Sequence, residues 1–391
     1  MNRREFLQQT GLVSSAMLMP NFLSALAHPA ANSARRLIII QLSGGNDGLN
    51  TVIPYQNDLY YQNRPKLAIS KQNLLPVHTE FGLHSSLVDF AKFYEQGELA
   101  IINGVGYPNP NRSHFRSMDI WHTASDSNQH LQTGWVGRLL DHHCYNHEAM
   151  AVESSEALSL AMKGETCSGF ALGPDGNLDQ LTKNPLLNPL AGEQTFQNAS
   201  NEFLYKTLTS TLQTADYIKE QITKKRLTDK FPFHDLGKQL KSIAHLIAAG
   251  LESRVYYASV SGFDTHINQD NAQTRLLRQV NDSVSALVAS LKKHNEWDSS
   301  LIFVFSEFGR RIAQNGSNGT DHGHGNVNFV LGGNLKQAGQ VNQLPDLLNT
   351  PTGDIKMQVD FRSIYATLLE NWLGYDSDLV LGKRFDTMGF V

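Results

Sequence analysis

Carboxylate and imidazole side chains gather in four short, glycine-flanked segments of this sequence. Oxygen and imidazole donors of this kind are the ligand set expected for Zn, Mn or Mg, rather than for a metal held by thiolates. Glycines on either side let the backbone turn sharply enough to bring such side chains together. We therefore predict a shared site for one or two divalent metal ions. Its candidate ligands are Asp47, Asp264, His266, Glu307, His322 and His324.

Each of these residues has a simpler explanation when it is taken alone. An aspartate after a strand is more often a helix cap, and a single histidine is more often an ordinary surface group. The joint pattern favours a metal or active site, because four separate segments carry the same kind of ligand. His84 and His114 lie outside these segments and are second-tier candidates, each of which we expect to be structural.

The four segments lie beside runs of apolar residues that have the character of buried strands. The clearest runs are residues 37–40, 255–260, 301–305 and 327–331. Helical periodicity over stretches such as 236–247 and 270–294 separates these runs. The alternation predicts a doubly wound, mostly parallel α/β sheet with helices on both faces. In such a sheet ligands bind beyond the carboxyl ends of the strands, which is where most of these segments fall.

The middle of the chain is less regular. Residues 165–200 carry glycine, proline and asparagine without clear periodicity, and residues 196–226 have the pattern of one long polar helix. We predict a partly helical insertion at 165–230 that lies over the sheet as a substrate cap. It would belong to a single α/β domain of residues 36–391.

A different kind of candidate lies where a predicted helix begins, near Ser113. Backbone N–H groups and the helix dipole favour an anionic substrate at such a position. Arg112 and Arg116 could hold that anion through paired hydrogen bonds. The Ser113 hydroxyl either attacks the substrate or only caps the helix, since serine is a preferred cap. Both interpretations stay open at this point.

The first residues have the features of an export signal. Arg3 and Arg4 precede a weakly apolar run over residues 11–26, and Ala25-Leu26-Ala27 offers a signal-peptidase site. The run is too short and too polar to span about 30 Å of hydrocarbon. We predict that residues 1–27 are a twin-arginine signal. The twin-arginine translocation machinery would export the folded chain to the periplasm or beyond, without a stable membrane span after cleavage.

Charge and cysteine content exclude some classes of function. With 37 acidic and 33 basic residues the formal charge is −4, so there is no electrostatic reason to bind nucleic acid or an anionic membrane. Cys144 and Cys167 are the only cysteines. A protein that folds before export first meets a reducing compartment, so we expect two unpaired thiols and no cysteine-based metal site.

Several motifs together resemble one known family over residues 36–373. The sequence is similar to the twin-arginine-exported domain-of-unknown-function family numbered 1501, a branch of the alkaline phosphatase/sulfatase-like superfamily. The motifs are Gly44-Gly45-Asn46-Asp47-Gly48, Phe81-Gly82-Leu83-His84, Arg112-Ser113-His114-Phe115, Gly262-Phe263-Asp264-Thr265-His266, Ser306-Glu307-Phe308-Gly309-Arg310-Arg311 and Gly319-Thr320-Asp321-His322-Gly323.

The resemblance implies a doubly wound sheet with two divalent metals held by aspartates and histidines. By this resemblance Asp47 matches the metal aspartate of the first strand, and Asp264 with His266 matches the next pair. His322 or His324 matches the late histidine. Glu307 falls where the superfamily has an Asp-His pair, and Phe308 replaces the histidine there. One of the two metal positions is therefore altered in this chain.

The predicted function is an exported, metal-dependent hydrolase of phosphate or sulfate esters that acts on a small anionic substrate. The alternative is a catalytically inactive, metal-stabilised binding or accessory protein on the same fold. A Ser-His-Asp esterase is excluded, because no Gly-Asp-Ser block precedes Asn46 and because Asp264 and His266 stand one residue too close together. The sulfatase signature Cys-x-Pro-Ser-Arg is also absent.

Overall fold

The chain is organised around a long sheet in which β1 (Arg36–Ser43) is an inner strand. The computed structural model describes residues 35–143, 150–173, 212, 214–350 and 352–391. Within these residues nine strands pair in the order β11-β5-β10-β9-β1-β8-β6-β7, with β12 also paired to β5. The other strands are β5 (Leu99–Gly106), β6 (Met150–Glu153), β7 (Phe170–Ala171), β8 (Ser253–Ser261), β9 (Ser300–Phe305), β10 (Asn326–Gly332), β11 (Gly339–Gln340) and β12 (Val359–Asp360).

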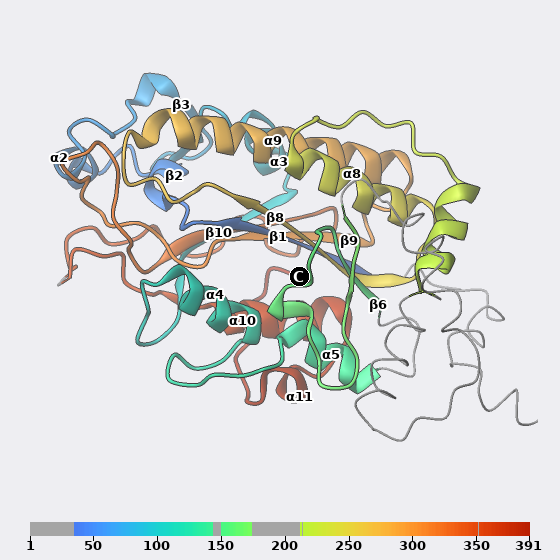
Figure 1. The fold of residues 1–391 in the computed structure, drawn as a ribbon. Helices are drawn as coiled ribbons and strands as arrows, with labels where there is room; N and C mark the ends of the chain where they lie inside the picture. Colours follow the sequence, from blue (N-terminus) through green and yellow to red (C-terminus); the bar gives the residue numbers. More distant parts are fainter. Residues whose placement is uncertain (1–34, 144–149, 174–211, 213, 351) are drawn as a thin grey trace, which may run out of the picture.

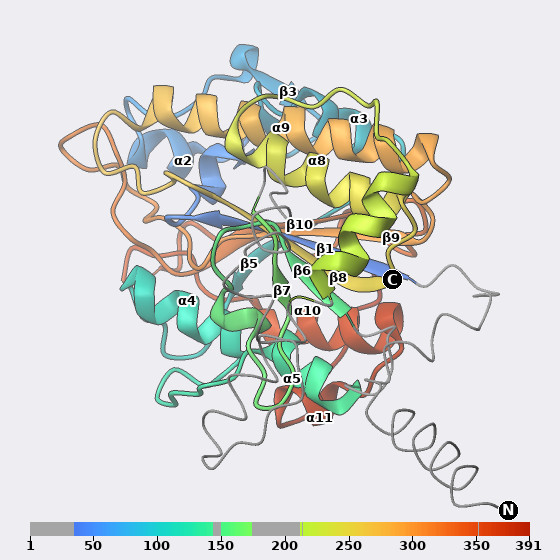
Figure 2. The ribbon, with the colours of Figure 1, turned by 45° about the vertical axis from the view of Figure 1, so that its right-hand side comes forward.

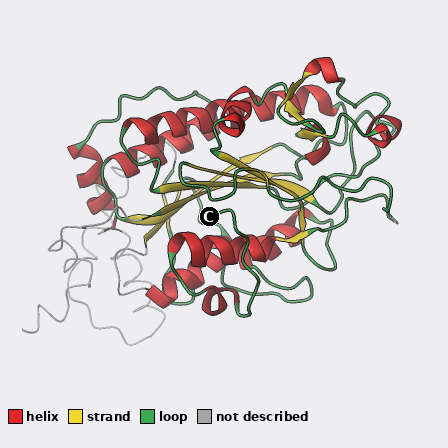
Figure 3. Ribbon diagram, turned by 180° about the vertical axis from the view of Figure 1, so that it is seen from behind, coloured by secondary structure: helices red, strands yellow, loops and turns green. Residues whose placement is uncertain are grey.

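Helices cover both faces of this sheet (Figures 1 and 3). One face carries α3 (Val88–Glu95), α8 (Asp235–Ala248) and α9 (Gln269–Lys293). The other carries α4 (His114–Thr123), α5 (Trp135–His143), α10 (Phe361–Thr367), the π-helical η7 (Leu368–Leu373) and α11 (Ser377–Leu381). Figure 2 shows the same two layers of helices from a second direction.

The side chains of β1 explain why its sequence is apolar without alternation. Ile38, Ile40 and Leu42 point into the core beneath α8 and α9, and Leu37 and Ile39 point into the opposite core. Successive residues of a strand face opposite sides of the sheet, so a strand covered on both faces needs apolar residues at every position. The predicted class, a mostly parallel α/β sheet between two layers of helices, is confirmed.

One strand departs from the expected orientation. β1 pairs in parallel with β8 and β9, but β10 runs antiparallel to β9 and to β5. The start of β10 therefore lies at the same edge of the sheet as the carboxyl ends of β1, β8 and β9. The loop that precedes β10, residues 319–325, is brought to that edge for this reason.

A smaller sheet and a third apolar cluster lie beside the main sheet. The small sheet has the strand order β2-β4-β3, and Tyr60 and Ile53 are central in its cluster. Its elements are β2 (Val52–Ile53), β3 (Leu74–Pro76) and β4 (Gly82–His84), with the short helices η2 (Gly48–Asn50), α2 (Asp58–Asn63) and η3 (Lys71–Asn73). A further short helix, η5 (Leu160–Met162), follows β6.

Two of the predicted segments fall mainly outside the described residues. These are the export signal at 1–27 and most of the insertion at 165–230. Residues 214–224 of that insertion are helical, and its role as a cap stays a prediction. Among the residues that the structure describes, we find no helix with the length and apolar character that crossing a membrane requires.

The expectation of two unpaired thiols is wrong. Cys167 is disulfide-bonded, and the described part of the chain holds no free cysteine. Cys144 lies outside the described residues. We expected the chain to fold in a reducing compartment, and this expectation did not predict the disulfide of Cys167.

Gly44, which directly follows β1, is a position at which neighbouring backbone leaves no room for a side chain. Its φ is +120°, and an added Cβ would lie 2.4 Å from the backbone nitrogen of Asp264. Gly97 has a φ of +73° but no atom within 4 Å of an added Cβ. We expect Gly97→Ala to lower the free energy of unfolding by about 1–2 kcal/mol, the usual cost of a left-handed residue. Gly44→Ala should cost more than about 3 kcal/mol, because backbone must also move.

Urea unfolding of the two glycine variants beside the unsubstituted protein measures this difference. Equal losses of unfolding free energy in Gly44→Ala and Gly97→Ala would contradict the close approach of the end of β1 to the segment after β8.

Candidate metal centre

Four side chains from distant parts of the chain meet at the edge of the sheet described above. We call His114, Asp264, His266 and His322 the His–Asp cluster. The Nε2 atom of His322 lies 3.0 Å from Nε2 of His114 and 2.9 Å from Nε2 of His266. The same atom is 3.1 Å from Oδ1 of Asp264. His266 Nε2 and His114 Nε2 lie 3.0 Å and 3.4 Å from that carboxylate oxygen.

Each imidazole of the cluster is held from behind through its other nitrogen. His322 Nδ1 is 2.8 Å from the backbone carbonyl oxygen of Arg112. His114 Nδ1 is 2.8 Å from Oε1 of Glu307, and His266 Nδ1 is 3.2 Å from Oδ1 of Asp321. A carbonyl oxygen only accepts hydrogen bonds, so His322 donates from Nδ1 and its neutral ring has a lone pair on Nε2. The carboxylates of Glu307 and Asp321 favour the same tautomer in the other two rings.

The donor atoms of the cluster fit a divalent metal ion. Three imidazole lone pairs and a carboxylate oxygen that face one another repel unless a cation lies among them. Metal–ligand bonds of about 2.0–2.1 Å place neighbouring ligands of a tetrahedron about 3.3–3.4 Å apart. The ligand atoms of His114, Asp264 and His322 lie 3.0–3.4 Å apart, close to that value, and these three residues form a group with the spacing of metal ligands. His266 contacts Asp264 and His322 but is not part of that group. Ligand histidines whose second nitrogen donates to a carboxylate or carbonyl are also typical of metal centres.

The local electrostatics favour the ligand form of Asp264 and His322 and make His114 more basic. Burial would raise the pKa of Asp264, but the hydrogen bond and the positive charge of Arg310 help to outweigh it, and this pKa is lowered to about 2. Burial lowers the pKa of His322, which favours its neutral ring. The hydrogen bond to Glu307 raises the pKa of His114, so this imidazole is a more basic donor. Asp264 and His266 keep 46% and 39% of their side chains exposed, so the cluster is open to solvent on that side.

Arg310 connects the segments that carry the cluster. Its guanidinium is buried and donates to the carbonyl oxygens of Gly45, Gly44, Phe263 and Thr320. It also donates to Oδ1 of Asp264 at 2.8 Å. One side chain therefore fixes the end of β1, the segment after β8 and the loop before β10 relative to one another.

Of the residues predicted as ligands, Asp264, His266 and His322 come together in the cluster, and Glu307 lies directly behind His114. Glu307 is buried, and its Oε1 also accepts from the backbone N–H of Gly44 at 2.8 Å. The ring of Phe308, the residue that replaces a histidine in the resemblance, lies 4.8 Å from the rings of both His114 and His322. It closes one side of the cluster with an apolar wall.

Asp47 and His324 have other partners. Asp47 is buried and accepts from Arg64 at 2.6 Å and from Gln269 at 2.5 Å. The Arg64 guanidinium therefore supplies the positive charge beside this carboxylate. His324 Nδ1 lies 3.6 Å from Oδ2 of Asp354, and His324 lines a separate cavity.

The predicted substrate-binding residues lie around the start of α4, and they differ in what they contact. Ser113 is exposed and its hydroxyl makes no cap hydrogen bond to the helix. Arg112 pairs with Asp354 through its guanidinium. Arg116 donates to the backbone carbonyl oxygens of Ser127 and Gln129, so it holds the loop after α4. Of these three residues, Ser113 is the one whose hydroxyl makes no cap hydrogen bond, and it directly precedes His114 of the cluster.

His114 was only a second-tier candidate that we expected to be structural, whereas the structure brings it beside His322 and Asp264. Its position as the first residue of α4 places it at the edge of the sheet. The signal was present in the motif Arg112-Ser113-His114-Phe115, but only the tertiary structure shows that this helix start faces the loop before β10. His84, the other histidine expected to be structural, is buried, and its Nδ1 accepts from the backbone N–H of Ser86.

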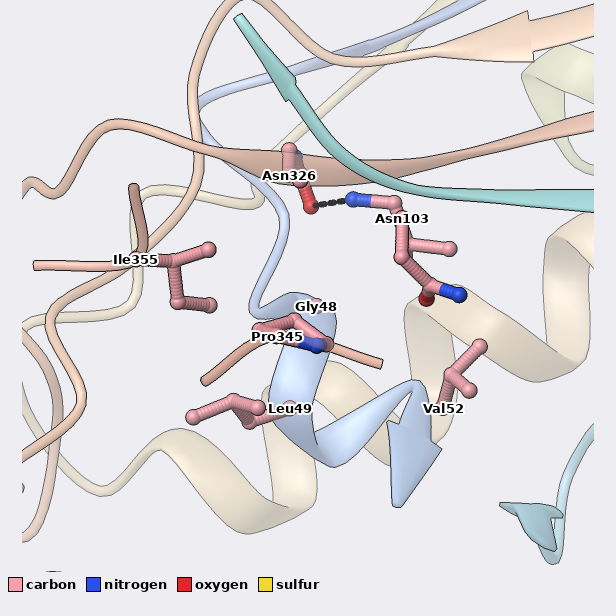
Figure 4. A pocket seen from close by; sticks show the side chains of 9 residues that line it. Gly48, Leu49, Val52, Asn103, Asn326, Pro345 and Ile355 are labelled. Carbon is pink, nitrogen blue, oxygen red and sulfur yellow. Dashed lines mark hydrogen bonds between the residues drawn. The ribbon is translucent and has the colours of Figure 1, made fainter. Parts of the chain in front are cut away.

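Two cavities lie near the cluster's supporting segments. The larger, of about 350 Å³, is lined by residues 106–110, Phe308, His324, Gly325, Lys356 and Met357. The smaller, of about 10 Å³, lies between Asn103 of β5, Asn326 of β10, Leu49 and Ile355 (Figure 4). It has room for one water molecule, so only the larger cavity can take an organic group.

Comparison with known proteins gives one family match. The sequence pattern of a family described as a protein of unknown function, DUF1501, matches residues 200–384. This match includes Asp264, His266, Glu307 and His322 but stops short of His114 in the N-terminal half. No curated protein matches the chain.

Among solved structures, similar folds include three proteins of bacterial origin. A protein of the alkaline phosphatase superfamily from Vibrio parahaemolyticus has a TM-score of 0.41 and 10% identity, over 90% of this chain and 69% of that one. The PsFucS1 sulfatase from Pseudoalteromonas sp. has a TM-score of 0.40 and 12% identity, over 91% and 70%. The C-terminal periplasmic domain of EcEptC from Escherichia coli, in complex with Zn, has a TM-score of 0.37 and 9% identity, over 77% and 73%.

The Asp47–Arg64 pair generates a prediction about stability. The side chains are 1% and 0% exposed, so removing one partner leaves an uncompensated buried charge. We expect Arg64→Met to lower the free energy of unfolding by about 3–5 kcal/mol. Lys92→Met breaks the exposed pair with Asp89 and should cost less than about 1 kcal/mol.

Chemical denaturation of both variants measures these costs. A loss at Arg64 as small as that at Lys92 would show that the Asp47 carboxylate has another counter-charge. The double variant Arg64→Met, Asp47→Leu should recover most of the stability, since no buried charge is then left alone.

Proposed function

We propose that this chain is a metal-dependent hydrolase of phosphate or sulfate esters whose divalent ion is held by the His–Asp cluster. The observation that supports it best is the convergence of three imidazole Nε2 atoms and one carboxylate oxygen. Each imidazole has its Nδ1 committed elsewhere, so the atoms that converge are those suited to bind a cation. Three imidazoles and one carboxylate favour Zn over Mg, which prefers oxygen ligands.

The charge around the cluster suits an anionic substrate. A bound divalent ion supplies Lewis-acid stabilisation of charge on the ester oxygens. Asp264 is the one carboxylate among the four ligands, so it neutralises half of a divalent charge. The exposed sides of Asp264 and His266 leave a path from solvent. An anionic phosphate or sulfate group is attracted to such a centre.

Ser113 is the proposed nucleophile. It directly precedes the ligand His114, and its hydroxyl is exposed and not used to cap α4. Its oxygen would form a bond to phosphorus or sulfur as the alcohol of the ester leaves, and water would then release the product and restore the serine. The backbone N–H groups of the first turn of α4 lie at the same place and favour the anion.

Export belongs to the same proposal. The signal predicted over residues 1–27 would send the chain through the twin-arginine machinery to the periplasm or beyond. A cluster built from residues as far apart as His114 and His322 exists only in the folded chain, so export after folding would allow the metal to bind in the cytoplasm.

A second candidate function is a metal-stabilised binding or accessory protein without catalysis. His266 as a fourth ligand beside His114, Asp264 and His322 would close a tetrahedral site, and closed sites are typical of structural zinc. A catalytic ion needs a further position for substrate. Full metal content without turnover of any phosphate or sulfate ester would favour this second candidate.

The metal site can be tested by elemental analysis of the purified chain. We expect close to one divalent ion per chain in the unsubstituted protein and a loss of at least tenfold in affinity in His322→Ala, since ligands and their partners each matter this much. His142→Ala removes an exposed histidine of α5 and serves as the control, which should keep its metal. Undiminished metal in His322→Ala would refute the site.

The role of Ser113 can be tested separately by activity. Turnover of phenyl phosphate, bis(4-nitrophenyl) phosphate and 4-nitrophenyl sulfate should fall by at least about a hundredfold in Ser113→Ala, the scale expected for a residue that takes part in the chemistry. Metal content and thermal midpoint should not change. Ser317→Ala, at another exposed serine, is the control. Full activity of Ser113→Ala would leave the serine without a catalytic role.

A further inference from the structure

The cavity of about 350 Å³ is a neighbour of the His–Asp cluster. Phe308 lines it, and the ring of Phe308 lies 4.8 Å from the rings of His114 and His322. His324, two residues after the ligand His322, also lines it. The loop over residues 106–110 forms another wall and leads directly into Ser113 and His114. The cavity and the cluster thus share one wall, the ring of Phe308.

The size of the cavity indicates what it can hold. Ligand pockets usually have volumes of about 300–1,000 Å³, so this one lies at the small end. An apolar cavity of about 150 Å³ takes a benzene molecule. A cavity of about 350 Å³ therefore accepts a group of roughly two fused rings.

The side chains of the wall indicate the chemistry of that group. Pro108, Pro110, Met357 and Phe308 present apolar surface, and Met357 is 41% exposed although it is a large apolar residue. None of the lining residues is acidic, and Lys356 contributes a positive charge. These walls disfavour a cationic group and favour an apolar one. Prolines offer flat, rigid surfaces that lose little entropy when a ring packs on them.

We propose that this cavity binds the organic part of the substrate and selects esters of a bulky apolar alcohol, of the size of a naphthol. The inference rests on the proposed function, because it places the phosphate or sulfate group at the His–Asp cluster and the ring system against Met357 and the two prolines. It assigns His324 to the wall of this pocket.

Two esters with leaving groups of similar acidity test the selection. We expect kcat/KM for 2-naphthyl phosphate to exceed that for phenyl phosphate by at least tenfold in the unsubstituted protein. Met357→Trp fills the cavity and should reduce the ratio to near one. Leu348→Trp places the same side chain at a 72% exposed position and should keep the ratio. Unchanged metal content and thermal midpoint in both variants show that each has folded.

Binding without turnover separates this inference from the proposed function. Naphthalene-2-sulfonate should bind to the unsubstituted protein, and its Kd, followed by fluorescence, should rise at least tenfold in Met357→Trp. Ester turnover without a preference for naphthyl, or equal Kd in the two proteins, would overturn the inference and leave the hydrolase intact. Loss of binding in Met357→Trp with no turnover of any ester would support the pocket and overturn the hydrolase.

Discussion

The buried guanidinium of Arg310 is the interaction on which the rest of the site depends. It donates to backbone carbonyl oxygens of β1's end, of the segment after β8 and of the loop before β10, and also to the carboxylate of Asp264. A planar group with five donors can satisfy several acceptors at once, which a lysine ammonium cannot do with the same geometry. Because the charge is buried, it also keeps Asp264 ionised. Three segments that are distant in sequence are therefore fixed relative to one another.

The orientation of the histidines comes from a second group of buried contacts. Glu307 holds His114 and also accepts from the backbone of Gly44, so the first helix of the site and the first strand are tied to the same carboxylate. The carbonyl of Arg112 holds His322. Rings fixed from behind lose little entropy when they bind an ion, and this preorganisation is the physical basis of the proposed metal site. The apolar ring of Phe308 borders both the cluster and the neighbouring cavity.

Much of the fold could be read from local pattern. Leu37–Ile40 and Leu301–Val304 are apolar at every position, because both faces of the sheet are covered, and this character identified inner strands of a parallel sheet. The stripe of α8 likewise matched its buried face. The direction of β10 could not be read in this way, since an apolar strand has the same composition whether it runs parallel or antiparallel. The pairing of Cys167 was also missed, because redox compartment says little about which thiols lie close together.

The residue types of the candidate ligands and the segments that carry them can be read from the sequence, since Asp264, His266 and His322 stand in glycine-rich loops beside apolar strands. Which of the candidates face one another depends on the tertiary structure. The antiparallel course of β10 brings His322 to the edge where α4 begins, and His114 joins the cluster there. Arg64 forms an ion pair with Asp47, and Glu307 contacts the Nδ1 side of His114. A side chain's partner depends on contacts across hundreds of residues, and local spacing does not contain that information.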